Sequence, residues 1–157
     1  CWVLLFLLET NNKKRKKYLI TGADLQNYNC LDWLGRALAF GKSGFKKDAR
    51  KGRHFLELAA KQGYPAAYSN LGRLMNTELN SSRLYGNRSG LAYFQKASDL
   101  GHRQGTEAAG RCCMELKEYE HALKYLMKAK GMVIGDTING SLRLERDIET
   151  CLRKLSS

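Results

Sequence analysis

Apolar residues recur along most of this chain at the spacing of a helix that has one apolar and one polar side. The C-terminal stretch shows the pattern most clearly, with apolar residues at Leu144, Ile148, Cys151, Leu152 and Leu155. Glycine, proline and polar clusters interrupt the pattern and predict helices at residues 14–26, 28–41, 48–63, 66–78, 89–101, 104–116, 118–131 and 141–155, with Ser141 as the N-cap of the last. The chain is therefore predicted to be all-α.

The predicted helices repeat as a unit. An aromatic residue recurs in register in four similar segments, and a small residue follows each aromatic four positions later. The aromatics are Tyr18, Phe55, Tyr93 and Tyr125, and the small residues are Gly22, Ala59, Ala97 and Ala129. A small residue lets a neighbouring helix approach closely, and we expect the aromatic one turn earlier to fill the adjoining gap. Such repeats are typical of solenoids, in which each unit packs on the next.

The dipeptide Gly-Arg stands at the same place in three of the units, at Gly35-Arg36, Gly72-Arg73 and Gly110-Arg111. A glycine inside a helix costs about 1 kcal/mol relative to alanine, so we expect each of these glycines to lie at a close helix crossing. We predict a short right-handed α-solenoid of helix-turn-helix repeats. In this prediction residues 1–13 are an apolar N-terminal segment, residues 14–132 the repeats and residues 133–157 a C-terminal capping helix.

The segment from Cys30 to Gly63 resembles a unit of the Sel-one-like repeats, a branch of the tetratricopeptide-related superfamily. In the order of that unit it carries Leu34-Gly35, Phe40, the loop GKSGFKKD, Phe55, Ala59-Ala60 and Gly63. The loop has one inserted residue, the second unit has NTELNSSRLYGNRSG in its place, and the third unit, MELKEYEHALKYLMKA, is six residues shorter. The resemblance covers residues 16–132 approximately.

The resemblance implies function only in broad terms. Members of the family are adaptors, scaffolds and signalling modules, so we expect a non-catalytic protein-interaction module. Some bacterial members are immunity proteins, and the alternative is that this chain neutralises a secreted toxin in the periplasm. One cysteine-rich branch is linked to beta-lactam hydrolysis, but its cysteines bridge within each repeat, and that pattern is absent from this sequence. A cell-wall or beta-lactam hydrolase is therefore the least favoured interpretation.

A row of arginines is the candidate binding site. The resemblance implies that the Leu-Gly helices line the concave side, where Arg36, Arg73 and Arg111 would lie on the order of 10 Å apart. A guanidinium group matches a carboxylate or a phosphate, so we predict an acidic protein or peptide as the partner.

Three further residues on the same helices are candidates for partner contacts. They are Trp33, Tyr68 and Asn70, which would add aromatic and amide groups beside the arginines. In the alternative interpretation the arginines are structural and pair with acidic residues of the next repeat. The candidates for that pairing are Glu78, Glu107 and Glu115.

Charge widens the choice of partners without selecting one. The chain has 27 Lys and Arg against 15 Asp and Glu, a net charge of +12, which favours anionic protein surfaces, lipid headgroups or nucleic acid. The run KKRKK at Lys13–Lys17 matches a nuclear-import patch, a phosphate- or lipid-binding patch, or simply a solvated helix face. The sequence has no aromatic-interleaved platform and no recognised nucleic-acid motif, so sequence-specific nucleic-acid binding is not predicted.

The apolar run Trp2–Leu8 is far shorter than the ~20 residues of a membrane-spanning helix, so stable membrane insertion is not predicted. We expect this run to be either a packed apolar end or the remnant of an export signal. Lipidation of Cys1 is disfavoured, because lipoproteins usually continue with small polar residues rather than with Trp-Val-Leu-Leu.

No cofactor, metal or catalytic residue is predicted. The five cysteines form no CxxC pair, and no histidine stands near them in ligand spacing. We expect free thiols, which favours a reducing compartment and hence the cytoplasm. His54, His102 and His121 fall at different helical phases, and no nucleophile has a base at a recognisable spacing. The sequence does not predict the oligomeric state.

Overall fold

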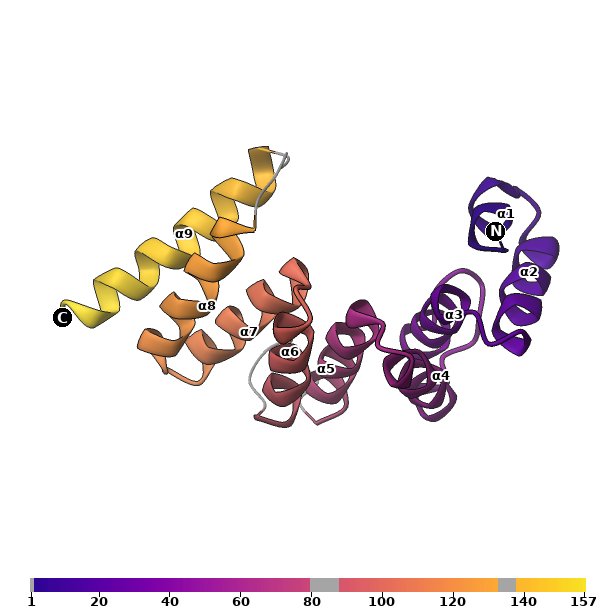
Figure 1. The fold of residues 1–157 in the computed structure, drawn as a ribbon, viewed down its shortest axis with the longest axis horizontal. Coiled ribbons are helices and arrows are strands. Elements are labelled where there is room, and N and C mark those ends of the chain that lie inside the picture. The colour runs from indigo at the N-terminus through magenta and orange to yellow at the C-terminus, as the bar shows by residue number, and fades with distance from the viewer. Residues whose placement is uncertain (1, 80–87, 133–137) are drawn as a thin grey trace.

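The computed structural model of this chain describes residues 2–79, 88–132 and 138–157, apart from the side chains of residues 78, 79 and 138–141. Within these ranges the regular structure is helical throughout, and the helices form a row that runs from α1 at one end to α9 at the other (Figure 1). The helices are α1 Trp2–Leu8, α2 Asn12–Asp24, α3 Tyr28–Phe40, α4 Ala49–Lys61, α5 Pro65–Leu79, α6 Arg88–Asp99, α7 Arg103–Glu115, α8 Tyr119–Gly131 and α9 Ile138–Leu155.

The predicted helices from residue 14 onward are confirmed, with bounds that differ by a few residues at most. Gly63 adopts a left-handed backbone conformation with φ of 77° just after α4, and Pro65 is the first residue of α5, where its missing N–H costs nothing. One expectation was incomplete and another was wrong. The apolar segment at the N-terminus forms a helix of its own, and α9 begins at Ile138, so Ser141 lies inside the helix and is not its N-cap.

The glycines of the Gly-Arg dipeptides lie at close helix crossings, as predicted. A Cβ added to Gly35 would lie 2.8 Å from Leu56 Cγ, and one added to Gly72 would lie 2.7 Å from the Phe94 ring. One added to Gly110 would lie 2.7 Å from the Leu126 side chain. Each crossing therefore joins two consecutive helices: α3 with α4, α5 with α6, and α7 with α8.

The repeated aromatics pack at the edge of the core, while the residues next to them in sequence occupy the centres of the Gly-Arg crossings. Phe55, Tyr93 and Tyr125 are half-buried, whereas the residues that directly follow them are completely buried. Those residues are Leu56, Phe94 and Leu126, the same three that contact the glycines. One residue further along a helix turns the side chain by about 100°, which moves it from the edge of the interface to its centre.

The Gly-Arg helices line one side of the row. The backbones of α3 and α5, of α5 and α7, and of α7 and α9 approach closely, whereas α6 and α8 meet through side chains, as where Gln95 donates to the Tyr125 hydroxyl at 3.1 Å. Helices that approach their counterparts in the next unit lie on the inner side of a curved solenoid. We call the side formed by α3, α5 and α7 the inner side.

Helix α9 packs on α7 and α8 at the far end of the row (Figure 1). Leu144, Ile148 and Cys151 are buried in one cluster with Leu126 and Phe94. The last two residues of the predicted apolar stripe are exposed, Leu152 by 51% and Leu155 by 44%. The apolar stripe is therefore buried only over the part of α9 that packs against α7 and α8.

Candidate binding groove

A cavity of about 380 Å³ opens between α3, α5 and α7 on the inner side. All three arginines of the Gly-Arg dipeptides line it, together with one of the three additional candidates, Asn70. We call it the inner groove; its polar lining includes Arg36, Asn70, Arg73, His102, Glu107 and Arg111. The fold thus brings together Arg36 and Arg111, which lie 75 positions apart in the sequence.

Arg36 lies at the α3 end of the inner groove beside a buried carboxylate. Its Nη1 is 3.8 Å from Oδ2 of Asp32, and Asp32 is only 1% exposed. Asn70 donates from Nδ2 to Oδ1 of the same carboxylate at 2.7 Å. Burial raises the pKa of Asp32, while the hydrogen bond from Asn70 and the charge of Arg36 act in the opposite direction. The amide of Asn70 is therefore committed to joining α5 to α3.

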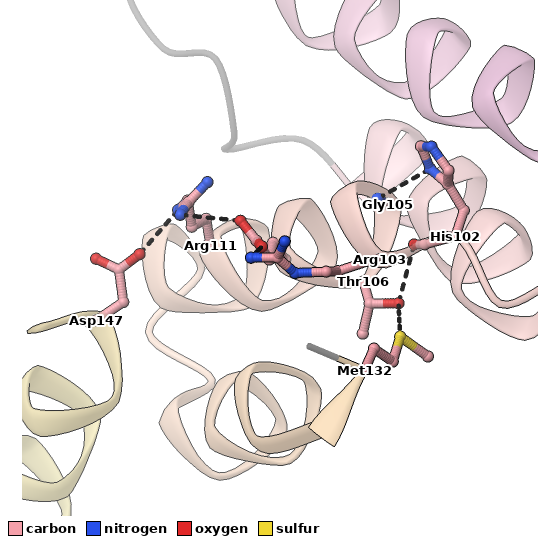
Figure 2. Close-up of polar contacts among 8 residues, drawn as sticks. His102, Arg103, Gly105, Thr106, Arg111, Met132 and Asp147 are labelled. Carbon is pink, nitrogen blue, oxygen red and sulfur yellow. Dashed lines mark hydrogen bonds and ion pairs between the residues drawn. The ribbon is translucent and has the colours of Figure 1, made fainter. Parts of the chain in front are cut away.

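Arg111 lies at the other end, within a network of ion pairs (Figure 2). Its Nε donates to Oδ2 of Asp147 in α9 at 2.8 Å, and its Nη2 lies 3.4 Å from Oε2 of Glu107. Arg103 Nη2 approaches the other oxygen of Glu107 at 2.9 Å. The Arg111 side chain is only 15% exposed. Arg111 thus pairs with Glu107, one of the predicted acidic candidates, and with Asp147 of α9, which the sequence did not indicate.

Arg73 differs from the other two arginines. It is half-buried in the middle of the row, and its Cζ lies 5.2 Å from the centre of the Phe40 ring. Among the described side chains, no carboxylate comes within ion-pair distance of its guanidinium group. The side chain of Glu78, one of the predicted partners, lies outside the described residues. Arg73 therefore presents a positive charge that the described part of the molecule leaves available.

A smaller hollow of about 40 Å³ continues from the inner groove and shares Arg36 and Arg73 with it. Trp33, Phe40 and Lys42 complete most of its lining. Arg36 Cζ lies 4.8 Å from the centre of the Trp33 ring, within the range of a cation-π contact. Trp33 therefore lies beside the arginines, as expected, and it also packs against Phe6 of α1 with ring centres 5.4 Å apart.

Tyr68 is not part of the inner groove. It lines a separate cavity of about 170 Å³ with Glu57, Leu71 and Tyr93, between α4, α5 and α6. The reason is helical phase, because Tyr68 precedes Arg73 by five residues and so points about 140° away from it around α5. Asn70 precedes Arg73 by three residues and shares its side of the helix.

His102 is a lining residue that the sequence did not indicate as part of this site. It is the N-cap of α7, where Nδ1 accepts a hydrogen bond from the Gly105 N–H at 3.1 Å (Figure 2). Burial lowers its pKa, so the ring is held neutral. The sequence could have indicated the cap role of His102, because it stands just before a predicted helix. A side chain at that position can accept a hydrogen bond from a backbone N–H group of the first turn.

The described residues contain no cluster of three His, Cys, Asp or Glu side chains arranged to hold a metal ion. None of the described helices combines the length and apolar character that crossing a bilayer requires. Cys30, Cys112, Cys113 and Cys151 are buried and form no disulfide within the described part of the chain, and Cys1 lies outside the described residues. The inner groove offers positive charge and amide groups, and the adjoining smaller hollow adds the aromatic faces of Trp33 and Phe40.

The sequence matches no protein-family model and no curated protein. Among solved structures, this chain is similar to a Sel1 repeat protein from Oxalobacter formigenes, with a TM-score of 0.62 and 22% sequence identity. The match covers 74% of this chain and 48% of that one, so the chain spans about half the length of the structure it matches. Likeness at this level of identity shows the fold. The chain is an all-α repeat solenoid with a Sel1-like fold, as the sequence predicted.

Proposed function

We propose that this chain is a non-catalytic protein-interaction module, an adaptor or scaffold, that binds an acidic segment of a partner protein in the inner groove. The observation that carries the proposal is the position of Arg73. Its guanidinium lies in the middle of a concave, helix-lined surface, and no described carboxylate neutralises it. A carboxylate of the partner would complete a bidentate, charge-assisted pair there.

The flanking arginines have a supporting role in this proposal. Arg36 is held by Asp32 and Trp33, and Arg111 by Glu107 and Asp147. Carboxylates compensate part of the charge of these two arginines. Their side chains are already ordered, so binding a partner costs little conformational entropy of the arginines. The cavity volume is at the small end of ligand sites, which suits one or two side chains of a peptide rather than a large cofactor.

The proposal is tested with labelled acidic peptides and matched peptides in which Gln and Asn replace Glu and Asp. We expect acidic peptides to bind preferentially and more weakly as the salt concentration rises. Replacing Arg73 by Gln should weaken that binding on the order of 10- to 100-fold, the value of a charge-assisted pair. Fluorescence anisotropy measures the dissociation constants.

The matched control is Arg50→Gln, which removes the same charge from an exposed position on α4, away from the groove. It should bind the acidic peptides like the unchanged protein. Equal loss in both variants would show that general positive charge, and not the groove, attracts the peptides, and the proposal would then be wrong. The immunity-protein and hydrolase alternatives stay predictions, because no contact in the described part of the chain favours either.

A further inference from the structure

The first helix leaves half of its apolar surface uncovered. On one side of α1, Phe6 is 1% exposed and packs against Trp33. The other side consists of four leucines with large exposed fractions: Leu4 56%, Leu5 45%, Leu7 50% and Leu8 79%. At about 100° per residue these four occupy a continuous arc of about 160°, centred opposite Phe6. Adjacent exposed leucines of this kind mark a contact surface.

The basic run Lys13–Lys17 that follows α1 contains two residues with contacts inside the molecule and three exposed lysines. Arg15 Nε donates to the Phe6 carbonyl at 3.2 Å, and its guanidinium lies over the Phe6 ring at 4.6 Å. Lys16 Nζ lies 5.2 Å from the centre of the Phe45 ring. These two residues hold the first two helices and the Phe45 loop in place. The remaining three, Lys13, Lys14 and Lys17, are exposed.

The exposed lysines begin close to the exposed leucines. Residues 9–12 alone separate Leu8 from Lys13, and Asn11 fixes the start of α2 by accepting from the Lys13 and Lys14 N–H groups at 3.0 and 3.3 Å. Glu9, the acidic residue in this connection, accepts the Asn11 N–H through Oε1 at 2.9 Å. Its carboxylate is thus engaged by the backbone beside the lysines.

We propose that this patch, Leu4, Leu5, Leu7, Leu8, Lys13, Lys14 and Lys17, docks the α1 side of the row on the surface of a bilayer that contains anionic lipids. Helix α1 has seven residues and is about 10 Å long, so it cannot span the ~30 Å hydrocarbon core but can lie in the interface. An apolar face with neighbouring lysines is the pattern of peripheral helices, whose leucines enter the headgroup boundary while the lysines meet lipid phosphates.

The charge of the patch favours an anionic bilayer over a second copy of this chain as the partner that covers the leucines. Two copies that paired their leucines symmetrically would bring six lysines towards one another, three from each patch, and their repulsion would oppose the dimer. An anionic bilayer covers the leucines and neutralises the same lysines. The patch lies at the α1 end of the row (Figure 1), so docking would leave the inner groove of α3, α5 and α7 open to a partner.

The test is flotation of the 157-residue chain with phosphatidylcholine vesicles that contain or lack 30% phosphatidylserine, a proportion of about one third chosen to model an anionic leaflet. We expect binding to the anionic vesicles only, weakening as salt is raised. Lys13→Gln, Lys14→Gln and Lys17→Gln combined should lower the partition coefficient on the order of 100-fold, since each lysine near an anionic surface contributes roughly fivefold. Leu4→Ser, Leu7→Ser and Leu8→Ser combined should abolish the binding as well.

Two matched controls test whether the effect is local. Arg50→Gln, Lys124→Gln and Arg146→Gln remove the same charge from exposed positions on α4, α8 and α9. Leu100→Ser and Met127→Ser remove apolar side chains that are 50% and 53% exposed elsewhere. Both controls, and Arg73→Gln, should float like the unchanged chain, which keeps this test independent of the proposed peptide binding. Circular dichroism verifies that each variant is folded.

Three results would overturn the proposal. The first is absence of flotation with anionic vesicles at low salt. The second is equal loss of binding in the charge control, which would make the attraction a property of the whole basic surface. The third is self-association, seen by analytical ultracentrifugation and removed by the leucine substitutions, which would show that a second copy covers the patch.

Discussion

Arg111 of α7 donates through Nε to Oδ2 of Asp147 in α9 at 2.8 Å, and this ion pair ties the last Gly-Arg helix to the C-terminal helix. Both side chains are largely buried, with 15% and 19% of their surfaces exposed. The same guanidinium also reaches Glu107 at 3.4 Å. An arginine that looks equivalent to Arg73 in the sequence is thus a structural link, and its contribution to stability can be measured.

The first prediction concerns that link. Arg111→Gln should lower the free energy of unfolding by about 2 kcal/mol, because it leaves Asp147 without its partner in a partly dry site and removes one of the two arginines that pair with Glu107. Asp147→Asn should lower the free energy of unfolding by less than Arg111→Gln does, because Glu107 still pairs with Arg111. Urea unfolding of both single variants and the double variant gives the coupling energy. If the two single effects simply add, the ion pair contributes no measurable coupling.

Spacing along the sequence could not separate these arginines. The repeat places Arg36, Arg73 and Arg111 at equivalent positions, and that placement alone predicted a shared surface. Which arginine is neutralised depends on acidic residues brought in by other helices. Asp147 lies 36 positions after Arg111, beyond the reach of any local helix rule. Asp32 was detectable in principle, because it stands four residues before Arg36 on the same side of α3.

The second prediction concerns Asp32. Burial raises its pKa, so the folded chain holds the proton more tightly than the unfolded chain does. This contribution to stability is fully present below the ordinary aspartate pKa and is lost as the pH rises through the raised value. The free energy of unfolding should therefore fall, relative to Asp32→Asn, as the pH increases through that window.

Urea unfolding of both proteins between about pH 3 and about pH 7 checks this trend. The asparagine in the variant keeps an oxygen that can accept from Asn70, so the junction between α3 and α5 is preserved. A difference in stability that is constant with pH, or one that grows in favour of the unchanged protein as the pH rises, would contradict the assignment.

The third prediction concerns the thiols. Burial raises the pKa of Cys113 to about 12, and it also raises those of Cys30 and Cys151. Because the thiolate is the reacting form, the folded protein should react with a thiol reagent at pH 8 far more slowly than in urea, on the order of 1,000-fold for Cys113. Cys1→Ser removes the one thiol outside the described residues. Fast labelling of the folded variant would show that this part of the core opens readily.

Most of the helical layout could be predicted because its signals are local. Glycine and proline mark helix ends wherever they occur, and apolar periodicity needs no knowledge of the partner helix. Helix α1 escaped prediction because a short run that is apolar on every side has no periodicity to read. The position of Tyr68 was a different kind of miss, because its spacing of five residues from Arg73 already places it about 140° away around α5 and so outside the inner groove.

The fourth prediction tests the helix crossing that the Gly-Arg pattern indicated. Alanine normally stabilises a helix interior by about 1 kcal/mol relative to glycine. At Gly72, however, the new Cβ would lie 2.7 Å from the Phe94 ring and 2.9 Å from the Gly90 carbonyl oxygen. Neither neighbour moves freely, because Phe94 is completely buried and the oxygen belongs to the backbone. Gly72→Ala should therefore lower the free energy of unfolding by about 1 to 3 kcal/mol through overpacking.

Gly131→Ala is the matched control, because a Cβ at this last residue of α8 would meet nothing within 4 Å. It should leave the stability unchanged or raise it by up to about 1 kcal/mol. Thermal and urea unfolding of both variants give the comparison. Because steric contact at the crossing is the reason for glycine at position 72, Phe94→Leu should also recover part of the stability lost in Gly72→Ala, measured against Phe94→Leu alone. Equal stabilisation by alanine at both positions would mean that α5 and α6 do not pack as closely as described.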